Sequence, residues 1–235
     1  MRKAGLITRD VLLYLAEKIA PGVKTKKLDE FAGEWLKRKN AVPAFKGYRG
    51  YPASLCVSIN DEVVHGIPGE RIIEEGDIVS IDIGVYYDGF YADGARTIPV
   101  GKVSETAERL IKVAESAFWN SIKVIREGAR VGDISAEIQE FVEKNGFSVV
   151  KEFVGHGIGF ELHEEPQVPN FGIRGTGCIL KEGMTLAIEP MVNEKDYRVR
   201  IMEDGWTAKT IDGGLSAHYE NTTAITDNGV LVLTY

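Results

Sequence analysis

The stretch that decides the fold of this chain is IVSIDIGVYYDGFYADGARTI, residues 78–98. Two runs of strand-forming residues flank Asp88-Gly89, and an Asp-Gly pair in this setting is the strongest short-range signal for a two-residue β-hairpin turn. The turn sets the register of both strands, so Tyr87 is expected to pair with Phe90 and the earlier residues to follow in order.

The same register brings two aspartates together. Gly84 is expected to pair with Asp93, and Asp82 with Ala95. This pairing puts both carboxylates on one face of the hairpin with their Cβ atoms no more than about 8 Å apart. The opposite face is apolar and is expected to point to the core, through Ile81, Ile83 and Val85.

Two carboxylates at this distance repel each other, and one stays protonated unless a cation binds between them. An isolated pair of aspartates with this spacing is more often a solvated strand face. The pair therefore predicts a metal site only together with further ligands.

Outward from the hairpin, the chain resembles itself. Residues 72–82, IIEEGDIVSID, align without gaps to residues 179–189, ILKEGMTLAIE. Upstream, at nearly the same offset, Gly22, Leu28, Trp35 and Leu36 match Gly128, Ile134, Phe141 and Val142. We therefore expect a single domain over 1–235, built from tandem half-domains of about 1–102 and 103–235.

Periodicity predicts helices over residues 25–39 and 105–126. A third helix is expected over 133–144, with Asp133 as its N-cap and Asn145-Gly146 as its stop. Strand patterns cover about 55–59, 78–87, 90–98, 147–153, 184–192, 198–203 and 217–225. The predicted class is α+β, with helices that cover an antiparallel-rich sheet.

The composition is that of an ordinary globular protein. Hydrophobic residues make up 44% and charged residues 27% of the chain, which argues against a disordered or fibrous protein. The net charge of -7 provides no general attraction for a phosphate backbone, so no specific nucleic-acid partner is expected. No apolar run approaches the roughly 18 residues of a membrane span, and no signal peptide is recognised.

The two cysteines, Cys56 and Cys178, lie far apart in the sequence. This spacing suits free thiols in a reducing compartment better than a disulfide framework. The expected location is cytoplasmic.

A second polar segment is VGHGIGFELHEEP, residues 154–166. Glycines on both sides of His156 exclude the helical HExxH zinc motif and are expected to place this histidine on a loop. A single histidine is more often a hydrogen-bonded structural residue, but its glycine-rich surroundings favour a functional role.

Two glutamates complete the candidate set. Glu189 ends the strand that repeats the Asp82 strand, and Glu220 lies in LSAHYENTTAI. Neither has an obvious cationic neighbour, and an unpaired buried acid is costly. Two divalent cations balance the four negative charges of the four carboxylates. The residues therefore predict a dinuclear metal site, whose ligands are Asp82, Asp93, His156, Glu189 and Glu220.

The order of these ligands resembles that of the methionine aminopeptidases, in their shorter type I form. The resemblance spans most of the chain through YPASLCVSINDEVVHGIP, VSIDIGVYYDGFYADGART, GHGIGFELHEEP, MTLAIEPM and AHYENT. It implies the duplicated pita-bread fold, a curved antiparallel-rich sheet covered by helices in pseudo-twofold halves. It also implies that a metal-bridged hydroxide removes the N-terminal methionine from nascent proteins and peptides whose second residue is small.

The resemblance implies a role for each ligand. Asp93 and Glu220 would bridge the metals, Asp82 would chelate one, and His156 with Glu189 would complete the other. Glu189 would also receive and return the proton of the attacking water. The two metal ions are divalent Co, Mn, Fe or Zn, between which carboxylates and one imidazole do not discriminate.

Two further histidines resemble catalytic residues of the family, although both could otherwise be structural. His163 matches the donor to the scissile carbonyl oxygen, and His65 matches the contact to the peptide nitrogen after the cut. The implied side-chain pocket consists of Phe45, Tyr48, Tyr51, Cys56, Leu162 and Trp206. The sequence departs from the family at Leu162, where an aromatic residue is frequent, and at His218, where Gln is common.

The implied partner is a peptide or nascent-chain N-terminus, with transient ribosome contact, no membrane partner and a monomeric state. Two alternatives remain open. A proline-specific aminopeptidase or dipeptidase of the same fold would share all five ligands, but usually carries an additional N-terminal domain. A catalytically silent binding module would be marked by the loss of ligands.

Overall fold

The computed structural model describes residues 1–235 without a gap. Its α-helices are α1 (Arg2–Ala16), α2 (Thr25–Arg38), α3 (Glu105–Ser121) and α4 (Val131–Lys144), and its 3-10 helices are η1 (Tyr48–Gly50) and η2 (Ile122–Val124). No helix is both long and apolar enough to cross a membrane.

Nine strands form one large sheet. They are β1 (Val42–Pro43), β2 (Cys56–Ile59), β4 (Ile78–Tyr87), β5 (Phe90–Pro99), β7 (Val154–Gly157), β8 (Glu164–Pro169), β9 (Thr185–Ile188), β14 (Glu220–Thr226) and β15 (Gly229–Val232). One small sheet has the order β13 (Ser216–His218), β10 (Met191–Asn193), β6 (Ser148–Val149), and the other has β11 (Val199–Ile201), β12 (Ala208–Thr210), β3 (Glu62–Val64).

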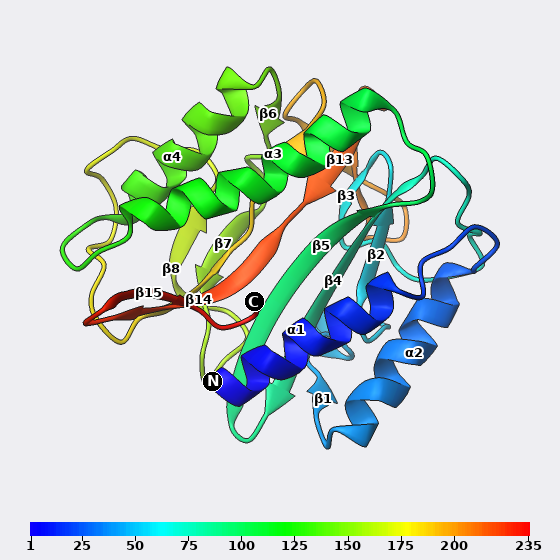
Figure 1. The fold of residues 1–235 in the computed structure, drawn as a ribbon, viewed down its shortest axis with the longest axis horizontal. Helices are drawn as coiled ribbons and strands as arrows, with labels where there is room; N and C mark the ends of the chain where they lie inside the picture. The colour runs from blue at the N-terminus through cyan, green and yellow to red at the C-terminus, as the bar shows by residue number, and fades with distance from the viewer.

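The large sheet joins the two ends of the chain. Its central path is β1-β4-β5-β14-β9-β7-β8, with β2 paired to β4 and β15 to β14, and every pair is antiparallel. The late strand β14 therefore lies between β5 and β9, as Figure 1 shows for its place beside β5.

The helices pack on the sheet in two groups, and each group has its own apolar core. Helices α1 and α2 contribute Leu12, Leu15 and Leu28 to one cluster, which also contains Ile81 and Ile83 of β4. Helices α3 and α4 build a second cluster around β9, β10 and β13. Figure 1 shows α1 lying across β4 and β5, and α3 running past β13. The predicted α+β class is confirmed.

The structure confirms the predicted hairpin. Asp88 and Gly89 have φ angles of 51° and 84°, the positive values that a type I′ turn requires at both central positions. Tyr87 pairs with Phe90, and the pairing continues in register to Ile78 and Pro99. Because β4 keeps strict alternation, its apolar residues face the helices and its aspartate faces the other way.

Helix α1 is absent from the sequence-based assignment, although its signal is present. Its fully buried residues Ala4, Thr8, Val11 and Leu15 recur at spacings of three and four, the helical period. Two of these four residues, Ala4 and Thr8, are too small or too polar to stand out as part of an apolar face.

Helix α4 begins earlier than predicted. Its N-cap is Arg130, and Asp133 is the third helical residue, where its Oδ2 accepts a hydrogen bond from the Arg130 N–H at 2.8 Å. Asp133 therefore accepts a hydrogen bond from the N-cap backbone N–H and is itself inside the helix, as the acidic residue of a capping box is. The predicted stop is confirmed, because Asn145 is the C-cap and Gly146 has a φ of 81°.

Several predicted boundaries are wrong. Helix α3 ends at Ser121 and continues only as the 3-10 helix η2, so it does not reach 126. The run 184–192 is two strands, β9 and β10, because Glu189-Pro190 interrupts the pairing. The run 147–153 keeps only β6, and the next strand begins at Val154.

Candidate metal centre and active site

The strand register places the acidic residues of β4, β5 and β14 on one face. Asp82 pairs with Ala95, and Ala95 pairs with Glu220. Directly paired residues share a face, and so do residues two apart on one strand, so Asp93 joins them. The small side chain of Ala95 leaves the space between Asp82 and Glu220 free.

The same rule places residues from the second half of the chain on this face. His156 on β7 pairs with Ala187 on β9, and Ala187 pairs with Thr222 on β14. Thr222 lies two residues after Glu220, and Glu189 two residues after Ala187. All five predicted ligands therefore lie on the side of the sheet away from the helices.

His156 lies on strand β7, and not on a loop as its glycine neighbours suggested. The glycines serve close strand packing. A Cβ at Gly155 would lie 2.4 Å from the Ala187 carbonyl oxygen, and a Cβ at Gly157 would lie 2.3 Å from the Glu165 carbonyl oxygen. Only glycine lets β7 fit between β8 and β9.

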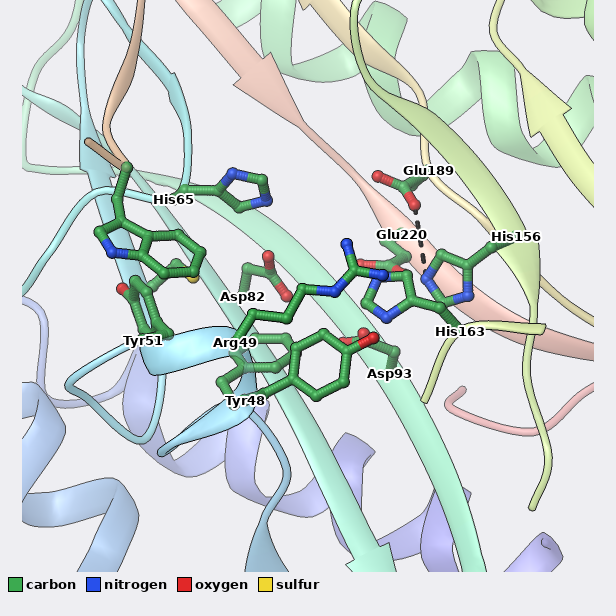
Figure 2. A pocket seen from close by; sticks show the side chains of 13 residues that line it. Tyr48, Arg49, Tyr51, His65, Asp82, Asp93, His156, His163, Glu189 and Glu220 are labelled. Carbon is green, nitrogen blue, oxygen red and sulfur yellow. Dashed lines mark ion pairs between the residues drawn. The ribbon is translucent and has the colours of Figure 1, made fainter. Parts of the chain in front are cut away.

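The ligand atoms are close enough to hold metal ions. One ligand atom from each of Asp93, His156 and Glu220 lies within 4.8 Å of the other two. The Nε2 atom of His156 is 3.8 Å from Glu189 Oε1. Figure 2 shows the four carboxylates and His156 arranged around one space, with the His156–Glu189 pair dashed.

The residues fit a cation because their buried polar atoms lack partners. Asp82 Oδ1 and Glu220 Oε1 are buried without a hydrogen bond, and no Lys or Arg forms an ion pair with any of the four carboxylates. Burial raises the pKa of Asp82, Glu189 and Glu220 well above the usual range, and the charge of Asp93 raises these pKa values further. Divalent cations remove this penalty.

His156 is prepared to bind a metal through one nitrogen. Its Nδ1 is 2.8 Å from the Gly157 carbonyl oxygen, which assigns the proton to Nδ1 and leaves the lone pair of Nε2 free. Burial lowers the pKa of His156, so the ring is neutral, as a metal ligand must be.

The five predicted metal ligands are called the ligand cluster below. His163 and His65 lie on two sides of it. The ring of His163 lies between His156, at 4.1 Å centroid distance, and Tyr48, at 5.2 Å. His65 packs edge-on against Phe153 and Trp206 and has a left-handed backbone with φ 61°. Burial lowers the pKa of both histidines to about 4, so both rings are neutral N–H donors at neutral pH.

A cavity of about 140 Å³ opens onto these groups. Its walls include all predicted metal ligands, both histidines and five of the six predicted pocket residues, which are Phe45, Tyr48, Tyr51, Cys56 and Trp206. The sixth, Leu162, is not in the lining. It is buried in a cluster with Ile158 and Ala187, and Phe45 and Tyr48 pack against this cluster.

The sequence matches the family model described as "Metallopeptidase family M24" over residues 1–227. The chain belongs to this family. The M24 chain is 55% identical over 234 residues to the methionine aminopeptidase of Clostridium perfringens, covering 100% of the chain and 94% of that relative. It is 47% identical over 234 residues to methionine aminopeptidase 1 of Bacillus subtilis, with the same coverage.

Solved structures agree with this assignment. The crystal structure of methionine aminopeptidase from Thermotoga maritima matches the M24 chain with a TM-score of 0.98 and 48% identity, covering 100% of this chain and 94% of that chain. A prolidase from Pyrococcus furiosus shares the fold, with a TM-score of 0.81, 24% identity and coverage of 100% and 62%. The pita-bread fold is therefore confirmed.

Membership in M24 makes this chain a metallopeptidase, a hydrolase that uses divalent metal. Two residues near the site escaped the sequence-based list of site residues. Arg49 lines the cavity, and its signal was its place in the Gly-Tyr-Arg-Gly-Tyr run, residues 47–51. His218 is buried, and its partnerless Nε2 lies 3.9 Å from one oxygen each of Glu189 and Glu220.

Proposed function

We propose that this M24 peptidase removes the N-terminal methionine from nascent proteins and peptides whose second residue is small. The observation that carries the proposal is the small, partly aromatic cavity beside the ligand cluster. A cavity of about 150 Å³ holds a benzene-sized group, so a cavity of about 140 Å³ that also contains the ligand cluster has room for no more than one apolar side chain, such as a thioether.

We further propose that this cluster would hold two divalent cations, with Asp93 and Glu220 among their ligands. Asp82, His156 and Glu189 would be the remaining ligands. When bound, such a pair supplies Lewis acidity and an activated water. The charge balance supports the number two, because four carboxylates and one neutral imidazole carry four negative charges. Mn, Fe, Co and Zn all suit this donor set.

Among the carboxylates, Glu189 is the proposed proton carrier. Its side chain is 13% exposed, whereas that of Glu220 is 3% exposed. A general base needs contact with the water whose proton it takes, and Glu189 is the more open of the two glutamates. It would then return the proton to the leaving amine.

His163 and His65 are proposed to position the substrate. His163, neutral and fixed by stacking, would donate a hydrogen bond to the scissile carbonyl oxygen as negative charge develops there. His65 would contact the peptide nitrogen that follows the cut. The free amine of the substrate would face Asp82 and the neighbouring carboxylates.

The proposal also covers the domain organisation, the oligomeric state and the cellular location of the enzyme. We infer one catalytic unit of two tandem halves, about 1–102 and 103–235, supported by equivalent backbone bridges between Lys24 and Ile72 and between Arg130 and Ile179. We also propose a cytoplasmic monomer that meets nascent chains during transient ribosome contact. The free thiols of Cys56 and Cys178 support a reducing compartment.

The test uses the purified full chain, stripped of metal and reloaded with Mn, Fe, Co or Zn in turn. Met-Ala-Ser should be cut, Met-Leu-Ser should be cut far more slowly, and Ala-Pro-Ser and N-acetyl-Met-Ala-Ser should remain intact. Packed cavity walls do not yield to a bulky second residue without strain, and an acetylated amine loses its charge.

Two outcomes would redirect the assignment. Preferential cleavage of Ala-Pro-Ser would replace methionine removal with proline-specific peptidase activity. No cleavage of any peptide with any metal would favour a silent binding module, although all five ligands are present.

A further inference from the structure

Arg49 is the only arginine or lysine that lines the catalytic cavity. Its side chain is exposed and forms no ion pair or hydrogen bond within the protein. Its guanidinium lies over the ring of Tyr48, 5.3 Å from the centroid. A planar fork of N–H donors is therefore left free at the mouth of the active site.

The backbone holds Arg49 in an unfavourable conformation. Its φ of 49° and ψ of 22° are left-handed, a region that non-glycine residues rarely adopt. Gly47 and Gly50 on either side are also left-handed, and hydrogen bonds from Gly47 N–H to Tyr51 O and from Tyr51 N–H to Tyr48 O close the loop. Strain of this kind persists where the surrounding structure overdetermines it, and it concentrates at functional sites.

The position of Arg49 relates it to the scissile carbonyl. Tyr48 stacks on His163 with an interplanar angle of 18°, so the loop that carries Arg49 rests on the proposed carbonyl donor. The charge of Arg49 contributes to the lowered pKa of His163. Figure 2 shows the Arg49 side chain extended across the pocket on the same side as Tyr48 and His163.

Arg49 does not serve to neutralise the carboxylates of the ligand cluster. No Arg49 ion pair to any of the four carboxylates exists, and bound divalent cations would repel a guanidinium. In the proposed function the methionine side chain enters the cavity and the rest of the chain leaves past His163 toward solvent. Arg49 would meet that departing part.

We propose that Arg49 forms a subsite for a substrate carboxylate downstream of the cut bond, so that peptides with Asp or Glu as the third residue are preferred. The subsite rests on the proposed methionine aminopeptidase activity. The third residue is the first with room for a charged side chain, because the second must be small. Arginine and carboxylate pair in a bidentate geometry, and a charge at the rim acts mainly on encounter and selectivity.

The experiment compares C-terminally amidated peptides that differ only at the third residue: Met-Ala-Glu-Ser, Met-Ala-Gln-Ser and Met-Ala-Lys-Ser. At low salt, kcat/KM for the Glu peptide should exceed that for the Gln peptide by about two- to fivefold, the usual range for an exposed ion pair. The Lys peptide should be the poorest substrate. The preference should shrink in 1 M salt, where the Debye length is about 3 Å.

Variants assign the preference to Arg49. In Arg49→Gln the ratio of kcat/KM for the Glu peptide to that for the Gln peptide should fall to about one, and in Arg49→Lys this ratio should stay partly raised. In Arg49→Glu the Lys peptide should become a better substrate than the Glu peptide. The matched control is Arg126→Gln, which removes an exposed arginine from the loop between α3 and α4 and should keep the full ratio. Ratios within one preparation cancel differences in metal loading and folded fraction.

A second arm distinguishes the source of the carboxylate, by comparing Met-Ala-Ser as the free acid and as the amide. An Arg49-dependent preference for the free acid would extend the subsite to the C-termini of short peptides. A wild-type Glu-to-Gln ratio near one, or a ratio that Arg49→Gln leaves intact, would overturn the subsite while methionine removal stood. No cleavage of any methionyl peptide would overturn the proposed function, and the subsite with it.

Discussion

At the scale of single residues, Asp93 is the electrostatic centre of the ligand cluster. After burial, its charge is the largest cause of the raised pKa of Asp82, Glu189 and Glu220. Burial also raises the pKa of Asp93 itself, to about 7, while a hydrogen bond from the Gly94 N–H limits the rise. Four mutually repelling acids hold their positions because the surrounding strands fix their backbones.

The first prediction concerns Asp93→Asn and His156→Ala. Each should lose metal and activity together, by about a hundredfold or more, because replacing even an outer partner of a metal ligand costs 10- to 100-fold. Circular dichroism should stay native, since the cavity side of these residues carries little of the apolar core. Elemental analysis after dialysis is the measurement. Full metal occupancy in both variants would contradict the ligand assignment.

The second prediction separates His163 from the ligands. His163→Ala should lower kcat by about 100- to 1,000-fold, the cost of removing a donor to a developing oxyanion, while metal content stays near that of the parent protein. His163→Asn, which keeps an N–H donor, should recover part of the rate. Simultaneous loss of metal from His163→Ala would move this histidine into the ligand set.

At the scale of elements, strand β4 supports one wall of the cavity because Gly84 has no side chain and leaves space for Phe45. A Cβ at Gly84 would lie 2.7 Å from Phe45 Cε1 and 3.0 Å from Ala44 Cβ. The aromatic wall therefore packs directly on the strand backbone beside Asp93, the residue paired with Gly84. The strand that supplies Asp82 also positions the pocket.

The third prediction is that Gly84→Ala displaces Phe45. Overpacking of this kind lowers the free energy of unfolding by about 1–3 kcal/mol, and KM for methionyl peptides should rise while metal content changes little. Gly33→Ala is the matched control, because the new methyl would meet only Ser54 Oγ at 3.7 Å and would favour helix α2. An unchanged KM in Gly84→Ala would show that Phe45 does not shape the substrate pocket.

At the scale of the whole molecule, the proposed active site lies where strands from early and late parts of the chain pair in one sheet. Strands β4 and β5 supply Asp82 and Asp93, strand β7 and the end of β9 supply His156 and Glu189, and β14 between them supplies Glu220. Folding therefore gathers four acids, which the proposed metal ions would stabilise. Burial of these four acids without metal should therefore lower the free energy of unfolding of the metal-free protein.

The fourth prediction is that metal-stripped protein loses stability as the pH rises from about 7 to 8. The folded-state pKa values of the four carboxylates are raised, so the stability from their protonated forms is present at low pH and is lost as the pH rises through those values. The buried histidines have lowered folded-state pKa values and act in the opposite direction, but most of their contribution is complete by pH 7, because the free imidazole titrates near 6.5.

Urea unfolding at several pH values measures this dependence, and the Mn-loaded protein is the control. With metal bound the carboxylates are ionised in both states, so the free energy of unfolding should be nearly independent of pH in the same range. A metal-free protein whose stability is flat or rises from pH 7 to 8 would contradict the raised carboxylate pKa values.

The sequence alone determined the features that depend on neighbouring residues and on internal repetition. The turn at Asp88-Gly89 and strict alternation set the register of β4 and β5, since both act over a few residues. The repeat of residues 72–82 in 179–189 identified Glu189 as the counterpart of Asp82. Local pattern was ambiguous at Asp133, because an acidic residue suits both the N-cap and the third helical position.

Tertiary structure alone decided which strands lie side by side. Alternation tells which face a residue shares, but not which distant strand lies next to it, so the insertion of β14 between β5 and β9 was invisible in the sequence. The same holds for burial, which leaves Leu162 outside the cavity lining and places His218 beside Glu189 and Glu220. Arg49 became a site residue only when a strained loop stacked on His163 placed it at the cavity mouth. These positions arise from packing between segments far apart in the chain, which no local pattern encodes.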